Sequence, residues 1–160
     1  MMSNAEIVRL KNGVTDYDHS QGPEGAPATL LEYGNFECSD CRRAFPVIKE
    51  VRRVLNDSFR FIFRHFPNVR THPHALRAAE AAEAASVQGK FWEMHDQLFT
   101  RQQALDDRDL SRYAARIGLD GDRFARDMVD KGVRRALAKA SKERGPEWRA
   151  KRDGGVAARG

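Results

Sequence analysis

Apolar residues along the first half of the chain predict two strands that flank one helix. Residues 28–36 form a short apolar and aromatic stretch typical of a buried strand, and residues 59–66 alternate as a second strand does. Between them, apolar residues at helical spacing predict a helix from Ser39 to about Asn56. A helix-length connection makes the two strands parallel, so residues 28–66 predict a right-handed βαβ unit.

The second half of the chain has helical patterns only. Three segments have residues typical of helix starts or helix ends, and each predicts a helix. A fourth helix is predicted from a cap at Asp120 or Asp122 to about Ser141. The first three predicted helices cover residues 73–87, 90–100 and 106–118. Four consecutive helices after a βαβ unit predict an inserted helical layer over residues 73–140.

The 160 residues suit one domain, long enough to bury a core. Residues 1–27 are expected to form an irregular lead-in with one short strand near residues 14–17. The α/β domain is expected over residues 28–140. Residues 141–160 are expected to form a basic tail without regular structure.

The composition is that of a soluble globular protein, with 41% hydrophobic and 32% charged residues, and no apolar run reaches membrane-spanning length. The net charge of +5 belongs to the tail, because residues 1–130 carry −2 and residues 131–160 carry +7. A basic tail can bind nucleic acid or anionic lipid, but this one has a single aromatic residue and no nucleic-acid module. We therefore expect a solvated charge run, with no nucleic-acid or membrane partner.

Without an apolar secretory segment at the start of the sequence, we expect a cytoplasmic location.

The only two cysteines, Cys38 and Cys41, fall at the junction of the first predicted strand and its helix. Their spacing places both sulfurs on one side of the first helical turn, where they can close a small disulfide ring. The helix start stabilises a thiolate at Cys38, which makes it a nucleophile, and Cys41 lies one turn deeper as a resolving thiol. This geometry predicts a redox-active pair.

Four further residues are expected to support or tune Cys38. Glu37 and Asp40 are acidic neighbours that disfavour the thiolate, and Ser39 stands beside Asp40 between the cysteines. His65 lies near the end of the second predicted strand, at the edge where ligands gather in open α/β sheets. A lone histidine there is also commonly a structural residue.

Two other interpretations of the cysteines remain. One is half of a zinc site, which His65, His72 and His74 would have to complete because there is no second C-x-x-C motif. The other is a structural disulfide, although so short a loop removes little entropy from the unfolded chain. The redox interpretation requires neither a metal nor a cofactor.

Three ordered blocks carry a family resemblance: YGNFECSDCRRAFP, FRFIFRHFP and HPHALRAAEAAEAASVQGKFWEMHDQLF. Over residues 14–130 the chain resembles the DsbA-like thioredoxin-fold oxidoreductases, especially their stand-alone and antiporter-fused bacterial branch. The resemblance implies a thioredoxin-like α/β fold with a helical insertion. It also implies that Cys38 attacks, that Cys41 resolves, and that the partners are protein or small-molecule thiols and disulfides.

The end of the chain departs from that family. Such proteins continue with a cis-proline loop, an antiparallel hairpin and a last helix, whereas KASKERGPEWRAKRDGGVAARG shows no apolar alternation and predicts no strands. The C-terminal ββα portion is therefore expected to be missing, with Pro146 in an ordinary loop. The end is then either frameshifted or truncated, or a genuine variant. The central strand would keep an open edge, which suits a homodimer or another partner.

Two classes of function follow from the sequence. The first is an enzyme that exchanges thiols and disulfides through Cys38 and Cys41. The second is a non-catalytic redox-sensing or binding module, or an inactive remnant, that keeps the cysteines but lacks the cis-proline substrate loop.

Overall fold

A four-stranded mixed sheet lies at the centre of the fold. The computed structural model describes residues 13–142 and 155–159. The strands are β1 (His19–Gln21), β2 (Ala28–Gly34), β3 (Phe59–His65) and β4 (Gly155–Arg159), in the spatial order β1-β3-β2-β4. Strands β2 and β3 are parallel, and β1 and β4 are antiparallel to their neighbours.

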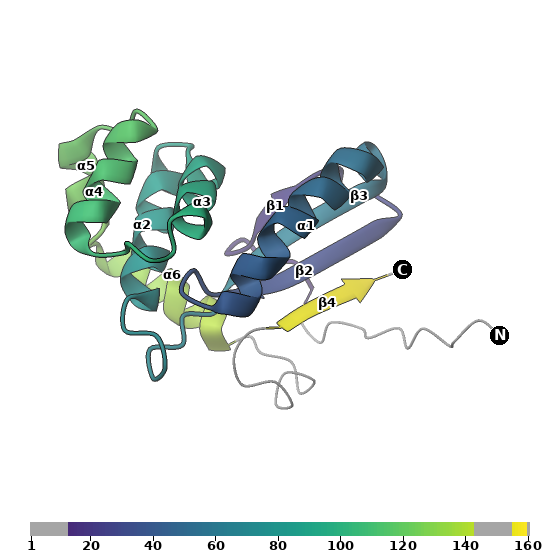
Figure 1. The fold of residues 1–160 in the computed structure, drawn as a ribbon, viewed down its shortest axis with the longest axis horizontal. Helices are drawn as coiled ribbons and strands as arrows, with labels where there is room; N and C mark the ends of the chain where they lie inside the picture. The colour runs from purple at the N-terminus through teal and green to yellow at the C-terminus, as the bar shows by residue number, and fades with distance from the viewer. Residues whose placement is uncertain (1–12, 143–154, 160) are drawn as a thin grey trace.

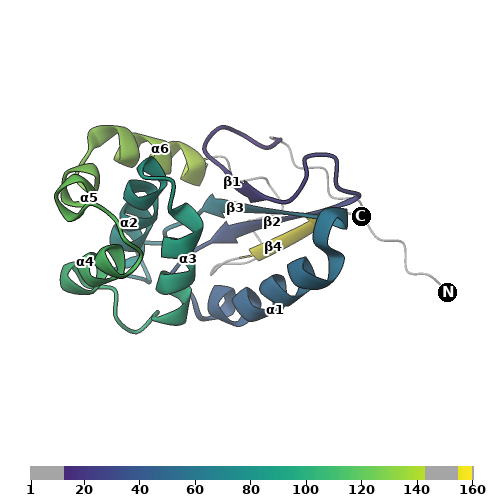
Figure 2. The same ribbon diagram turned by 90° about the horizontal axis from the view of Figure 1, so that it is seen from above.

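Helices cover the sheet and one of its ends. They are α1 (Ser39–Leu55), α2 (Ala75–Val87), α3 (Phe91–Thr100), α4 (Asp107–Arg116), α5 (Gly121–Asp127) and α6 (Lys131–Lys142), and a short 3₁₀ turn, η1 (Asn56–Ser58), precedes β3. Figure 1 shows α2 to α5 gathered at one end of the sheet. Figure 2 shows α1 and α6 on opposite sides of the sheet. None of the helices in the described part of the chain combines the length and apolar content that crossing a membrane requires.

The predicted βαβ unit is confirmed. Ala28 lies opposite Phe59 and Gly34 opposite His65, so the two parallel strands pair along their whole length. Both strands are buried on both faces, with Phe61 and Phe63 in the large core cluster and Ile62 in a second cluster. This burial on both faces explains why apolar residues occupy consecutive positions, as at Phe61, Ile62 and Phe63.

The short strand predicted near residues 14–17 lies later in the chain, at β1. Residues 15–18 form a turn instead, because the Thr15 N–H donates to Asp18 Oδ2 at 2.8 Å and the Asp18 N–H donates to the Thr15 carbonyl at 3.0 Å. Arg64 fixes this turn through an almost fully buried ion pair with Asp18, with Nη2 and Oδ2 2.6 Å apart. The side chain of Asp18 thus turns the chain before β1 can begin.

The single helix predicted after Asp120 is two helices, α5 and α6. Asp120 caps α5 as expected, but the Oδ1 atom of Asp130 accepts the N–H groups of Gly132 and Val133 and begins a new helix. Helix α6 then reaches the expected end.

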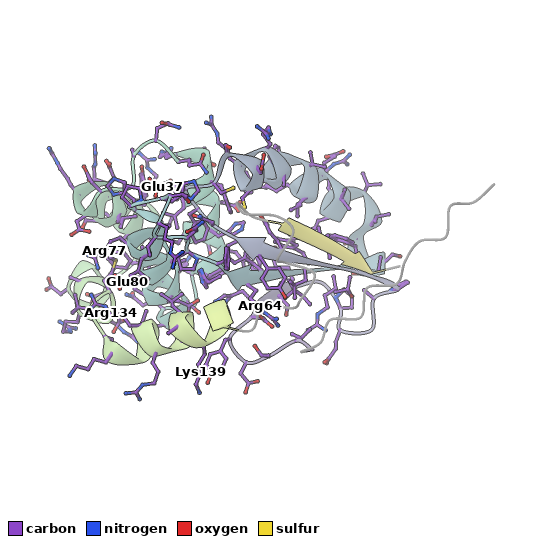
Figure 3. All side chains as sticks on the ribbon, turned by 90° about the horizontal axis from the view of Figure 1, so that it is seen from below. Glu37, Arg64, Arg77, Glu80, Arg134 and Lys139 are labelled. Carbon is purple, nitrogen blue, oxygen red and sulfur yellow. The ribbon has the colours of Figure 1, made fainter. Side chains whose placement is uncertain are left out.

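Buried Glu80 ties helix α6 to α2. Its two carboxylate oxygens accept hydrogen bonds from Arg134 at 2.8 Å and from Arg77 at 2.6 Å, and all three residues are labelled in Figure 3. Glu80 lies on α2, as Arg77 does, whereas Arg134 lies on α6. The break between α5 and α6 therefore allows the last helix to dock on the first helix of the layer.

The expectation of no strand in the tail is wrong for residues 155–159. These form β4, which pairs antiparallel with β2 from Thr29 to Tyr33. An edge strand offers a row of unpaired N–H and C=O groups, and an extended segment pairs with it whatever its side-chain pattern. The edge of β2 predicted to be open is therefore occupied, and dimerisation remains an untested prediction. Pro146 lies outside the described residues.

Candidate active site

Cys38 and Cys41 lie where β2 ends and α1 begins. Cys38 is the residue before the helix, with an extended backbone (φ −81°, ψ 127°), and Cys41 lies in the first turn. The two cysteines are not joined by a disulfide bond. Cys38 is 1% exposed and Cys41 is 4% exposed, so both thiols lie in the core beneath the surface.

The surroundings of Cys38 favour its thiolate. The largest influence is the hydrogen bond donated by the Cys41 thiol, and backbone N–H groups of Cys41 and Asp40 act in the same direction. Together they outweigh burial and the charge of Asp40, and they lower the pKa of Cys38 to about 6. The same hydrogen bond, together with burial, raises the pKa of Cys41. The two thiols therefore have distinct roles, with Cys38 ionised and Cys41 protonated at neutral pH.

Glu32 is a buried carboxylate beside Cys41. It lies on β2 with 2% exposure, and burial raises its pKa to about 7, against the opposing effect of a hydrogen bond with Cys41. Its Oε1 atom has no hydrogen-bond partner within the described part of the chain. A cavity of about 10 Å³ adjoins Glu32 and is also lined by Lys49, His95 and Asp96. Glu32 can therefore change its protonation state near neutral pH next to the thiol that has to lose a proton.

The helical layer holds the loop that carries Cys38. The side-chain amide of Gln102, just after α3, donates to the carbonyl oxygens of Phe36 at 2.9 Å and of Cys38 at 2.8 Å. Asn35 supports the same loop, because its Oδ1 accepts the Glu37 N–H at 3.0 Å and its amide nitrogen lies 3.0 Å from His72 Nδ1. The position of Cys38 thus depends on residues more than 30 positions away.

Of the predicted supporting residues, Glu37, Ser39 and Asp40 lie beside Cys38. Asp40 affects the pKa of Cys38 in two opposing ways, since its negative charge raises this pKa and its backbone N–H lowers it. The Asp40 carboxylate also forms an ion pair with Arg43 on the surface. The carboxylate of Glu37 binds another element, because its Oε2 accepts the His74 N–H at 2.8 Å at the start of α2. Ser39 is exposed at the first helical position.

His65 belongs to a different group of side chains. Its Nε2 atom lies 2.8 Å from Glu83 Oε1, and His65 is 1% exposed. Among the described residues, the side chains close enough to hold an ion together are His19, His65 and Glu83, and this group contains neither cysteine. The zinc site proposed from the sequence is therefore not assembled in the described structure.

Sequence reasoning missed two residues of the site, Glu32 and Gln102. Glu32 had a local signal, since it is the lone charged residue of the predicted strand at residues 28–36. Buried acids without a cation partner are uncommon outside functional sites. Gln102 had no such signal, because only the packing of the helical layer brings it to Cys38.

A parallel βαβ unit with paired cysteines at its strand-to-helix junction, and helices inserted after β3, define a thioredoxin-like redox protein. The thioredoxin family matches residues 14–147, and the chain belongs to this family. The DsbA-like thioredoxin fold with a helical insertion, which the sequence predicted, is confirmed.

Several solved structures have a similar fold, and two of them cover most of this chain. A thioredoxin-like oxidoreductase from Silicibacter pomeroyi superposes with a TM-score of 0.76 at 22% identity, over 90% of this chain and 81% of that chain. α-DsbA1 from Wolbachia pipientis gives a TM-score of 0.73 at 21% identity, over 91% and 76%. At these identities the likeness shows the fold.

Curated relatives are much longer than this chain. A Na(+)/H(+) antiporter NhaA 3 from Salinispora tropica is 49% identical over 116 residues, which is 72% of this chain and 18% of that protein. A Na(+)/H(+) antiporter NhaA from Herminiimonas arsenicoxydans is 44% identical over 129 residues, which is 78% of this chain and 20% of that protein. The chain spans about a fifth of the length of these relatives.

Proposed function

We propose that the chain is a thiol–disulfide oxidoreductase in which Cys38 attacks and Cys41 resolves. The observation that carries this proposal is the asymmetric pair of thiols, in which Cys41 donates a hydrogen bond that lowers the pKa of Cys38 to about 6. A thiolate is the nucleophile of disulfide exchange, so at neutral pH the pair is already in its reactive form.

In the first step, the Cys38 thiolate attacks one sulfur of a substrate disulfide. A mixed disulfide forms with Cys38, the substrate S–S bond breaks, and the departing substrate thiolate takes up a proton. In the second step, the carboxylate of Glu32 accepts the proton of Cys41, and the resulting thiolate attacks the Cys38 sulfur. This closes the Cys38–Cys41 disulfide and releases the second substrate thiol. The substrate gains two electrons, and the cysteine pair loses them.

Glu32 suits the role of base for Cys41. Its pKa of about 7 is high enough to take up a proton and low enough to release it at neutral pH. The adjoining cavity is about the size that one water needs, and it gives this proton a route past Lys49 and Asp96, which are partly exposed.

A groove beside the cysteine loop suits an extended substrate. It has a volume of about 450 Å³ and is lined by Glu37, His72, His74, residues 102–106 and Asp109. We propose that the chain flanking a substrate disulfide lies there, and that the partners are protein or small-molecule thiols and disulfides. The cytoplasmic location expected from the sequence stays a prediction.

A redox-sensing module is the second candidate, and the burial of Cys38 favours it. With 1% of Cys38 exposed, a folded protein substrate reaches the sulfur only if the covering groups move. A sensor needs access only for a small oxidant or thiol.

Reduction of insulin by the purified chain with excess dithiothreitol tests the proposal. We expect turnover above the uncatalysed rate, its loss in Cys38→Ser, and a trapped mixed disulfide in Cys41→Ser. If the folded chain reduces insulin no faster than Cys38→Ser does, the proposed oxidoreductase activity is refuted. Reversible closure of the Cys38–Cys41 disulfide without turnover would then support the sensor.

A further inference from the structure

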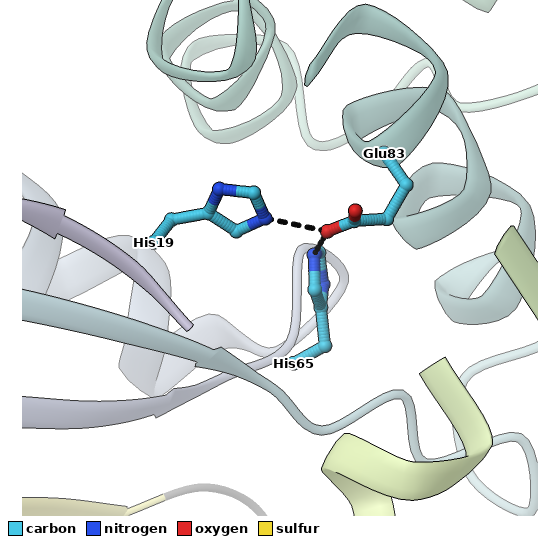
Figure 4. A group of neighbouring side chains, drawn as sticks. All are labelled: His19, His65 and Glu83. Atoms are coloured by element: carbon cyan, nitrogen blue, oxygen red, sulfur yellow. Dashed lines mark hydrogen bonds and ion pairs between the residues drawn. The ribbon is translucent and has the colours of Figure 1, made fainter. Parts of the chain in front are cut away.

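Three side chains outside the cysteine site converge on one point between the sheet and the helical layer. His19 Nε2 lies 2.6 Å and His65 Nε2 lies 2.8 Å from the same oxygen, Oε1 of Glu83 (Figure 4). His19 comes from β1, His65 from the end of β3 and Glu83 from α2. Their ligand atoms all lie within 4.8 Å of one another.

Aromatic rings hold both imidazoles in place. The His19 ring stacks on Phe91, with ring centroids 3.4 Å apart and planes 8° apart. The His65 ring meets Phe63 edge to face, with centroids 5.2 Å apart, and also contacts Phe36. His65 is almost fully buried, whereas the side chains of His19 and Glu83 are 17% and 18% exposed. The group is thus set in an apolar wall and reaches solvent on one side.

This donor set has the chemistry of a transition-metal site. Two imidazole nitrogens and one carboxylate oxygen are ligands that Zn²⁺ takes in proteins, often with a fourth position left for water. Mg²⁺ and Ca²⁺ prefer six or more oxygen ligands, which this group does not supply. We propose that His19, His65 and Glu83 form a binding site for a divalent ion of the zinc class.

Two of the three separations between the ligand atoms are already close to those that such an ion requires. Zinc ligands lie about 2.0–2.2 Å from the metal, so tetrahedral ligand atoms stand roughly 3.3 Å apart. The present separations of 2.6 and 2.8 Å between Glu83 Oε1 and the two nitrogens need to open by about 0.5 to 0.7 Å, and the two nitrogens lie within 4.8 Å of each other.

The alternative to a metal site is a hydrogen-bonded cluster without metal. One buried atom, His65 Nδ1, is compatible with both arrangements. His65 Nδ1 has no hydrogen-bond partner among the described residues. It is an acceptor without a donor if Nε2–H donates to Glu83, and a donor without an acceptor if Nε2 binds a metal. A measurement of metal binding therefore distinguishes the two arrangements.

The ion would join three elements that are distant in sequence. It would link the edge strand β1 and the end of β3 to the first helix of the inserted layer, and so stabilise the docking of that layer on the sheet. A ligand that binds only the folded state stabilises it by RT ln(1 + L/Kd), where L is the free ligand concentration, so the unfolding temperature rises with the logarithm of the ligand concentration once this exceeds Kd.

The experiment uses the full chain with Cys38→Ser and Cys41→Ser as the background, stripped of metal. Calorimetry measures Zn²⁺ binding, and thermal unfolding measures the stabilisation that Zn²⁺ provides. The background removes the thiols, which bind zinc themselves. Glu83→Gln and His19→Gln are the test variants, and His74→Gln, an exposed histidine, is the matched control. Co²⁺ serves as a second probe, because its visible absorption reports the coordination geometry.

We expect one Zn²⁺ per chain, a higher unfolding temperature with Zn²⁺, and a tetrahedral Co²⁺ spectrum. Glu83→Gln and His19→Gln should each weaken Zn²⁺ binding at least tenfold, whereas His74→Gln should leave it unchanged. If the folded background protein binds no Zn²⁺ at 100 µM, or if both test variants bind as tightly as their parent, the site does not exist. Insulin reduction plays no part in this measurement, so the outcome is independent of the proposed oxidoreductase activity.

Discussion

Glu32 on β2 is buried and Glu83 on α2 is mostly shielded from solvent, and the protonation behaviour of the two carboxylates is opposite. Burial by itself raises the pKa of both. For Glu32 burial prevails, and the pKa rises to about 7, because the hydrogen bond with Cys41 opposes it only in part. For Glu83, hydrogen bonds from His19 and His65 overcome burial and lower the pKa to about 2. The donors around a buried carboxylate, more than the depth of its burial, decide whether it holds a charge.

The two environments suit different tasks. A carboxylate that changes its protonation near neutral pH can move a proton, as the proposed resolution by Cys41 requires. A carboxylate that stays ionised down to acidic pH can anchor imidazoles or a cation. Substitutions at the two glutamates should therefore affect stability in opposite directions.

The largest expected effect is that of Glu83→Leu with metal removed by a chelator. It leaves His19 and His65 without their shared acceptor, and each lost hydrogen bond to a charged group costs about 1.5–3 kcal/mol. We expect a loss of about 3 kcal/mol in the free energy of unfolding at pH 7, measured by urea denaturation. Glu93→Leu, at an exposed glutamate on α3, is the control and should change stability by less than about 0.5 kcal/mol. Equal effects of the two substitutions would contradict the anchoring role of Glu83.

Glu32→Gln should act in the opposite direction. The folded-state pKa of Glu32 is about 7, above its ordinary value of 4.5, so its ionisation destabilises the fold above pH 7 and not below pH 4.5. The difference corresponds to about 3 kcal/mol, since one pKa unit is 1.36 kcal/mol. We expect Glu32→Gln to be more stable than the parent at pH 8 by up to this amount, with the gain vanishing toward pH 4.5. A gain that is independent of pH would show that Glu32 is not ionising in this range. Glu24→Gln, at an exposed position, is the control.

The same Glu32→Gln substitution should slow the resolving step. A positioned general base contributes roughly 10²-fold or more, so we expect the mixed disulfide at Cys38 to persist about 100 times longer at pH 7. Rapid mixing with a disulfide substrate, acid quench and mass spectrometry measure its lifetime. The attacking step should be nearly unchanged, which separates a base for Cys41 from general damage to the site. Equal slowing of both steps would contradict the assignment.

The smallest expected effects concern the pKa of Cys38. The rate of its alkylation by iodoacetamide should rise with pH, with a midpoint near 6, because only the thiolate reacts. Cys41→Ala removes the strongest hydrogen bond to the thiolate and should raise the midpoint by about one unit, as a bond of about 1.4 kcal/mol predicts. Asp40→Asn should lower it by only a few tenths of a unit, since this carboxylate is exposed and paired with Arg43. If the midpoint of the alkylation rate is the same in Cys41→Ala as in the parent, the proposed asymmetry of the two thiols is contradicted.

Local signals in the sequence were sufficient for most helices and for the two central strands. Helix α1 begins at Ser39 as predicted, and β3 ends within one residue of its predicted bound. The break before α6 was missed because the capping role of Asp130 competes with a continuous apolar pattern. Strand β4 was missed because pairing with β2 depends on an open edge elsewhere in the fold and not on the pattern of the tail.

The amino-acid sequence alone was sufficient to place the cysteine pair, since two cysteines three positions apart at a strand-to-helix junction share one helical turn and the positive end of the helix dipole. The side chains that surround the two cysteines depend on how distant segments pack together. Glu32 reaches Cys41 from the sheet, and Gln102 reaches the carbonyl of Cys38 from 64 positions away. The meeting of His19, His65 and Glu83 is likewise a product of packing, because the sheet order and the docking of α2 bring together side chains that share no local pattern.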